Sequence, residues 1–144
     1  MPDLIDQLLA APGRYVGSSG PPGEAADGPP DVGVIEVVAL PGRSGVMITY
    51  EVLKASGEVP HREHAVLART GSGAVLVTSH SHAQVTTIIP EAEPGWFPAA
   101  DTSPFPMAIR LEVPEPGRLV YSWSYGWDDH PLELRDQADV RRVD

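Results

Sequence analysis

Two histidines separated by one residue, His80-Ser81-His82, are the first candidates for chemistry in this sequence of 144 residues. On a β-strand, residues i and i+2 point to the same face, so the two imidazoles can approach one ion. Metal ions such as zinc take three or four ligands of this kind, and His64 on a neighbouring predicted strand would supply the third. A metal-dependent enzyme built on His64, His80 and His82 is therefore one hypothesis. The alternative is that His80 and His82 are polar residues that line a cavity or contact solvent.

The densest aromatic cluster lies in residues 119–127, where aromatic and small residues alternate. This alternation places Tyr121, Trp123 and Tyr125 on one face of a strand. Two interpretations stay open. The three rings form a core ladder beneath the N-terminal segment or the loop 90–106, or they wall an apolar ligand cavity. In the second case the tyrosine hydroxyls and the tryptophan indole would be its few polar groups.

Arginines are concentrated in the last predicted strand, residues 134–142. Its alternation separates Arg135, Gln137, Asp139 and Arg141 from Leu134, Asp136, Ala138, Val140 and Arg142. If the first set faces inward, Arg135 can hold an anionic group, because a guanidinium offers a fixed fork to a carboxylate. If that set faces outward, its members form ordinary cross-strand ion pairs.

Signatures of hydrolases and nucleotide-binding enzymes do not occur: the sequence contains no G-x-S-x-G, no P-loop and no G-x-G-x-x-G. The chain has no cysteine, which excludes thiolate nucleophiles, thiolate metal sites and disulfides. Two acids, Glu51 and Glu63, are able to face each other across strands, but spacing alone does not place them in one pocket. A protein that is not an enzyme is therefore expected.

Charge and composition limit the partners. The net charge is −10 with a single lysine, Lys54, and binding to nucleic acid or to an anionic membrane surface depends on Lys and Arg. The N-terminus carries acidic residues where a secretory signal would be basic, and no apolar stretch approaches about 18 residues. The sequence therefore predicts a cytoplasmic protein without a nucleic-acid partner or membrane insertion.

Gly and Pro number 14 and 16, about a fifth of the chain, yet 42% of residues are hydrophobic. This combination favours many short strands joined by turns. An apolar stripe predicts one short helix over residues 3–10, and strands follow at 32–40, 45–53, 61–69, 74–89 (with a bend near His80), 107–113, 118–125 and 134–143. Long loops are expected over residues 18–31 and 90–106. Within the second loop, Trp96 and Phe97 would either cap the fold or contact a second copy in a homodimer.

These elements predict one domain over residues 1–144: an all-β, antiparallel, up-and-down β-barrel of about eight to ten strands with a short N-terminal helix. Closure into a barrel is favoured because it removes the two exposed sheet edges.

Three features resemble the calycin-type β-barrels, which include lipocalins, fatty-acid-binding proteins and nitrobindin. They are the helix followed by Gly13-Arg14-Tyr15-Val16-Gly17, the strand meander over 32–140, and the ending Ala138-Asp139-Val140-Arg141-Arg142. The resemblance implies a barrel interior that binds small hydrophobic ligands. Fatty-acid-binding proteins hold the ligand carboxylate with arginine and tyrosine, for which Arg135 with Tyr121 or Tyr125 would be the counterpart.

The resemblance to nitrobindin also raises the question of haem. Nitrobindin binds haem through a histidine near the start of its last strand, and Arg135 occupies the corresponding position here. Haem binding would then require His130, His80 or His82 as a substitute. The sequence therefore does not identify a cofactor. The function expected from the sequence is a barrel that binds a hydrophobic or amphipathic ligand through Tyr121, Trp123, Tyr125, Arg135, His80 and His82.

Overall fold

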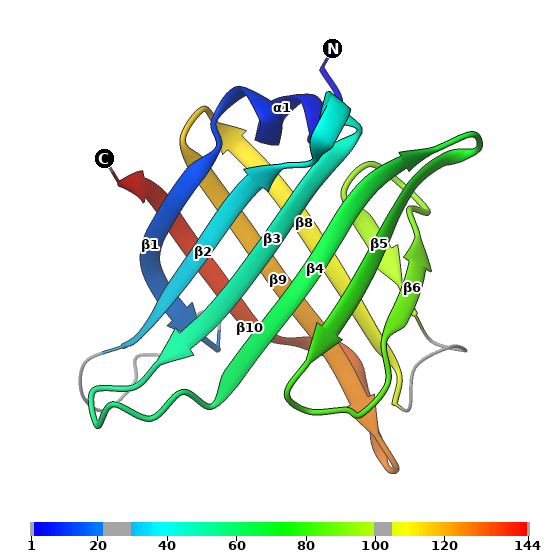
Figure 1. Cartoon of the computed structure of the whole chain (residues 1–144). Helices are drawn as coiled ribbons and strands as arrows, with labels where there is room; N and C mark the ends of the chain where they lie inside the picture. The colour runs from blue at the N-terminus through cyan, green and yellow to red at the C-terminus, as the bar shows by residue number, and fades with distance from the viewer. Residues whose placement is uncertain (1, 22–29, 100–104, 144) are drawn as a thin grey trace.

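The computed structural model describes residues 2–21, 30–99 and 105–143, and Figure 1 shows the chain as one helix against a strongly curved sheet. In chain order the elements are α1 (Leu4–Ala10), β1 (Gly13–Gly20), β2 (Asp31–Ala39), the 3-10 turn η1 (Pro41–Arg43), β3 (Gly45–Leu53), β4 (His61–Thr70), β5 (Gly73–His80), β6 (Thr87–Pro90), β7 (Trp96–Pro98), β8 (Met107–Glu115), β9 (Arg118–Trp127) and β10 (His130–Val143). The predicted all-β fold with one short N-terminal helix is confirmed.

The ten strands form one antiparallel sheet in the order β6-β5-β4-β3-β2-β1-β10-β9-β8-β7. Every pair in this order joins strands that are neighbours in sequence except β1–β10, which joins the strands at the two ends of the chain. The sequence neighbours β6 and β7 are the two edge strands. The outermost strands, β6 and β7, contact each other. The sheet therefore curls into a nearly closed barrel (Figure 1).

Strand alternation sorts the side chains between the barrel interior and solvent. On β3, Val46, Ile48 and Tyr50 are buried, and they share one face as the period of two predicts. On β4 the buried residues are Glu63, Ala65 and Leu67. The interior is thus apolar along most of its length, with one carboxylate inside it.

The helix α1 closes one end of the barrel. Asp3 caps it, because its Oδ1 accepts a hydrogen bond of 2.8 Å from the backbone N–H of Asp6. Ile5, Leu8 and Leu9 are buried where the helix contacts β2, β3, β4 and β8. Arg69, at the end of β4, forms ion pairs with Asp3 and Asp6. A two-turn helix is marginal alone, so this packing is what holds it in place.

Two segments differ from the sequence-based expectations. The predicted strand 74–89 is divided into β5 and β6 by a turn at residues 81–86. The predicted loop 90–106 contains β7, whose Phe97 pairs with Ile109 of β8 and is fully buried. Phe97 is therefore a core residue and does not contact a second copy. Residues 22–29 of the other predicted loop, and residues 100–104, lie outside the described residues. In the part of the chain that the structure covers, no helix is both long and apolar enough to cross a membrane.

Candidate functional site

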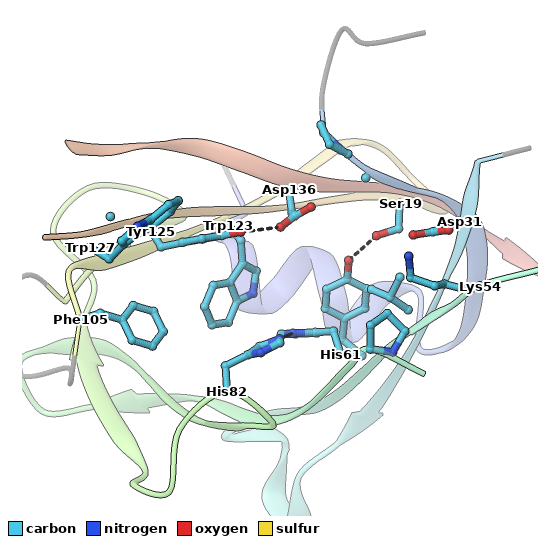
Figure 2. Close-up of a pocket in the computed structure, with 16 residues that line it drawn as sticks. Ser19, Asp31, Lys54, His61, His82, Phe105, Trp123, Tyr125, Trp127 and Asp136 are labelled. Atoms are coloured by element: carbon cyan, nitrogen blue, oxygen red, sulfur yellow. Dashed lines mark hydrogen bonds between the residues drawn. The ribbon is translucent and has the colours of Figure 1, made fainter. Parts of the chain in front are cut away.

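A cavity of about 480 Å³ opens at the end of the barrel opposite α1. The ends of β1, β3 and β9 and the starts of β2 and β4 surround the cavity. Residues just after β5 and just before β8 also line it. Most of its wall is apolar or aromatic, and Tyr50 is among the lining residues. Figure 2 shows further rings arranged around the space: His61, His82, Phe105, Trp123, Tyr125 and Trp127. The volume falls within the range of about 300–1,000 Å³ that is typical of small-molecule sites.

The aromatic rings support one another. Phe105 meets Tyr125 edge-on with ring centroids 6.3 Å apart, and Tyr125 lies 5.9 Å from Trp127. Trp123 meets the ring of His61 edge-on at 5.3 Å. Edge-to-face contacts of this kind stabilise aromatic clusters beyond their buried area, so the wall is held in a defined shape.

A buried carboxylate, Glu63, lies beneath this wall and is 1% exposed. Its Oε2 accepts hydrogen bonds from the hydroxyls of Thr78, at 2.6 Å, and Tyr121. Its Oε1 accepts from the indole N–H of Trp123 at 2.9 Å and lies 3.2 Å from Nε2 of His61. A carboxylate accepts at both oxygens when ionised, and here Thr78, Tyr121 and Trp123 donate to Glu63 while a ring nitrogen of His61 lies within hydrogen-bond distance.

Two imidazoles continue this network to the cavity. The Nδ1 atom of His61 lies 3.0 Å from Nε2 of His82, and the two rings stack with centroids 5.1 Å apart. Both rings line the cavity, with His82 at its rim. Glu63, His61 and His82 therefore form a continuous chain from the buried carboxylate to the ligand space.

Burial and neighbouring groups shift the titration of this cluster. Burial lowers the pKa of His80 and of His82, and the nearby His61 lowers both further. Burial raises the pKa of Tyr121, as does the adjacent Glu63 carboxylate. The Tyr121 hydroxyl thus keeps its proton and remains a donor to Glu63, while the imidazoles of His80 and His82 favour their neutral forms.

The rest of the polar lining is sparse. The hydroxyls of Ser19 and Tyr50 are hydrogen-bonded at 2.7 Å, and burial raises the pKa of Tyr50. The hydroxyl of Tyr125 donates to Asp136 at 3.3 Å. Asp31 and Lys54 complete the charged groups that line the cavity among the described residues. The cavity thus combines two carboxylates with one ammonium.

The structure brings most of the predicted site residues together. Trp123, Tyr125 and His82 line the cavity. Tyr121 is completely buried beneath it, where it holds Glu63. His80 is also buried; its ring meets Trp123 edge-on at 4.9 Å, and its Nδ1 accepts a hydrogen bond of 3.3 Å from the backbone N–H of His82. Tyr121 and His80 therefore support the wall from behind.

Arg135 lies outside the cavity. Its Nε donates to the carbonyl oxygen of Tyr125 at 2.6 Å, its Nη2 donates to that of Pro131 at 2.8 Å, and it pairs with Glu133 at 3.2 Å. The inward-facing residues of β10 are Asp136, Ala138 and Val140. This placement contradicts the prediction that Arg135 holds a ligand carboxylate inside the barrel. Outward-facing Arg118 and Asp139 instead form a cross-strand ion pair at 2.7 Å.

The predicted metal cluster of His64, His80 and His82 does not form. His64 is exposed and points away from the interior, because it alternates with the buried Glu63 and Ala65 on β4. Among residues 2–21, 30–99 and 105–143, no group of three or more His, Asp or Glu side chains is arranged to hold a metal ion. The histidine that joins His80 and His82 is His61, and its ring nitrogens face Glu63 and His82.

The residues at the position that nitrobindin uses for haem do not fit an iron ligand. Arg135 stands there, and its guanidinium has no lone pair for a metal and is bonded outside the cavity. Of the three possible substitutes, His130 stacks on Trp127 at 4.1 Å in the β9–β10 turn, and His80 lies behind Trp123. His82 lines the cavity but is engaged by His61.

Three important residues were missed from the sequence: Glu63, His61 and Asp136. The alternation of β4 carried a usable signal, since His61 and Glu63 share the parity of the apolar residues Ala65 and Leu67. The predicted alternation placed Asp136 on the same strand face as Ala138 and Val140, and this is the inward face. The irregular pairing of β10 with β9 before Asp136 is not visible in the sequence.

A scan against protein-family models finds no match, and comparison with curated proteins finds none. Among solved structures, the fold is similar to that of Rv2717c from M. tuberculosis, with a TM-score of 0.68 and 15% sequence identity. The match covers 99% of this chain and 100% of that one. The likeness shows the fold alone. It supports a barrel fold for this chain.

Proposed function

We propose that this protein binds a small, largely apolar molecule at the open end of its barrel. The observation that carries the proposal is the 480 Å³ cavity with its aromatic wall. Sites of this kind combine apolar side chains with a few fixed polar groups, here the Ser19–Tyr50 and Tyr125–Asp136 pairs. Apolar contact would supply most of the affinity, and these pairs would orient the ligand.

The charges favour a neutral ligand, or one that carries hydrogen-bond donors, over a fatty acid. Asp31 and Asp136 face the cavity, with Lys54 as the counter-charge, whereas the arginine expected to hold a carboxylate is bonded elsewhere. An anionic head group near two carboxylates is disfavoured by like-charge repulsion. The ligand that suits this site is therefore aromatic or aliphatic, with a donor group such as an amine or hydroxyl.

Titration with the neutral fluorophore N-phenyl-1-naphthylamine tests the proposal. Its fluorescence increases in an apolar environment, and we expect saturable binding of one probe per chain. Val52→Trp should abolish most of this binding, because Val52 lines the cavity and the larger ring would fill it. Val38→Trp is the matched control, since Val38 is exposed on the outer face of β2.

Binding that is unchanged in Val52→Trp, or equally weakened in Val38→Trp, would contradict the proposal. Laurate serves as the competitor that distinguishes ligand classes, and we expect it to displace the probe poorly. The cytoplasmic location and the homodimer stay predictions from the sequence.

A further inference from the structure

The hydrogen bonds that link Glu63, His61 and His82 indicate which ring nitrogen of each histidine carries the proton. Because Glu63 already accepts from Thr78, Tyr121 and Trp123 as a carboxylate would, we assign the proton of its contact with His61 to Nε2, which then donates to Oε1. In neutral His61 the other nitrogen, Nδ1, then has the lone pair and accepts from Nε2–H of His82. Neutral His82 is consequently left with its own lone pair on Nδ1. An imidazole oriented by a second group, which a carboxylate fixes in turn, is the arrangement of a general base.

We propose that the cavity is a site of proton transfer, in which His82 removes a proton from the bound molecule while His61 and Glu63 position it. This inference rests on the proposed function, because the substrate must first occupy the cavity. The proton moves from the substrate to Nδ1 of His82, and the electron pair of the broken bond stays on the substrate. The imidazolium that forms keeps its Nε2–H directed at His61, which remains hydrogen-bonded to the Glu63 carboxylate.

The cavity defines the substrate class. Its aromatic wall accepts a largely apolar molecule, and such a molecule can lose a proton to an imidazole only if a neighbouring electron-withdrawing group makes that proton acidic. The substrate is therefore a small apolar compound with one activated C–H or O–H, such as a proton next to a carbonyl group. The Ser19–Tyr50 hydroxyl pair lines the same cavity and is able to donate to an oxygen that becomes negative.

The charged and titratable groups around His82 leave it neutral and able to accept a proton near neutral pH. His61 and Glu63 face it from β4, His80 from the end of β5 and Asp136 from β10. Burial and His61 lower the pKa of His82, whereas Asp136 and Glu63 raise it by smaller amounts. Since the balance is a lowered pKa, the unprotonated base predominates at pH 7.

The probe for this activity is 5-nitrobenzisoxazole, a small aromatic compound with one activated C–H. When a base takes that proton, the electron pair of the C–H bond completes a nitrile and the ring N–O bond breaks, which releases a coloured phenolate. No further reactant is needed. We expect the protein to accelerate this opening beyond free imidazole at equal concentration, and His82→Gln to lower kcat/KM by at least about a hundredfold.

The control is His64→Gln, because His64 is on the same strand as His61 but faces solvent, and its activity should equal that of the unchanged protein. The pH profile separates catalysis from structural support. Activity should rise with pH through the lowered pKa of His82, and His61→Gln should lower kcat while KM stays the same, because His61 positions the base without holding the substrate. Thermal melts check that each variant is folded.

Turnover no faster than with free imidazole would overturn the proposal, as would equal turnover by His82→Gln or a kcat that His61→Gln leaves unchanged. Quenching of tryptophan fluorescence by the probe is measured in the same samples. If the probe quenches but is not converted, proton transfer fails while ligand binding stands. If it neither quenches nor reacts, the failure extends to the proposed function.

Discussion

At the scale of single residues, the most informative side chain is Glu63. A carboxylate inside an apolar barrel is costly unless its charge is compensated by hydrogen bonds, and here Thr78, Tyr121 and Trp123 donate to it together with His61. The same residue thus fixes Trp123 of the cavity wall and Tyr121 behind it, and it contacts His61, which leads to the ligand space. Glu63 therefore contributes both to the packing of the barrel and to the proposed proton transfer.

Removal of this carboxylate should strongly destabilise the fold. Glu63→Ala leaves the Tyr121 hydroxyl and the Trp123 indole buried without their acceptor, and we expect the free energy of unfolding to fall by about 3–5 kcal/mol. Urea denaturation measures the change. In Glu51→Ala, the control on the neighbouring strand, only a surface ion pair with Arg62 is lost, so the cost should stay below about 1 kcal/mol. Similar losses in the two variants would refute the role assigned to Glu63.

At the scale of elements, barrel closure depends on the pairing of β1 with β10. Gly17 lies opposite Val140 in this ladder, and a Cβ at residue 17 would be 2.1 Å from the carbonyl oxygen of Asp139. Contact this close with backbone leaves no room for a side chain. The two strands that join the ends of the chain can therefore approach only because glycine stands at position 17.

Gly17→Ala should accordingly destabilise the protein by about 1–3 kcal/mol or more, since the backbone must shift to admit the methyl group. Gly71→Ala provides the matched control: it lies in the β4–β5 turn with nothing within 4 Å of its position for a Cβ. There we expect no change or a gain of up to about 1 kcal/mol. Thermal and urea unfolding of both variants give the comparison, and an unaffected Gly17→Ala protein would show that this contact does not limit closure.

The predictions from sequence succeeded where local pattern decides the structure. The apolar stripe over residues 3–10 identified α1, and the strand predicted at 45–53 matches β3. They failed where pairing across the barrel decides it. The metal hypothesis selected His64 because it lies on a neighbouring predicted strand. It did not take into account that alternation on that strand puts His64 on the face opposite Ala65 and Leu67. Phe97 was assigned to a loop because its strand is three residues long and depends on β8 for pairing.

The candidate site was predicted only in part for the same reason. Trp123 and Tyr125 were recognised because they belong to one alternating strand. The hydrogen bond from Trp123 to Glu63 joins residues 60 positions apart, and no local pattern reports such a contact. Alternation on β10 separates Arg135 from Asp136 in the sequence, but which of the two faces is inward depends on the pairing of β10 with its neighbours in the barrel.

At the scale of the whole molecule, the two ends of the barrel have different roles. One end is filled by α1, whose apolar side chains extend the core. The other holds the cavity, and its lining comes from the ends of strands on every side of the barrel (Figures 1 and 2). A rigid sheet that is closed at one end and open at the other suits reversible entry of a small molecule from one direction.

The three tryptophans allow the central claim to be tested inside a single sample. Trp123 and Trp127 line the cavity, whereas Trp96 lies on β7 with the guanidinium of Arg110 over its ring at 4.7 Å. The measurement is a nuclear magnetic resonance titration of the indole N–H signals with N-phenyl-1-naphthylamine. Ligand binding in the cavity predicts saturable shifts for Trp123 and Trp127 and an unchanged signal for Trp96. Unchanged signals for all three, or a shift of Trp96 as large as the others, would contradict the account.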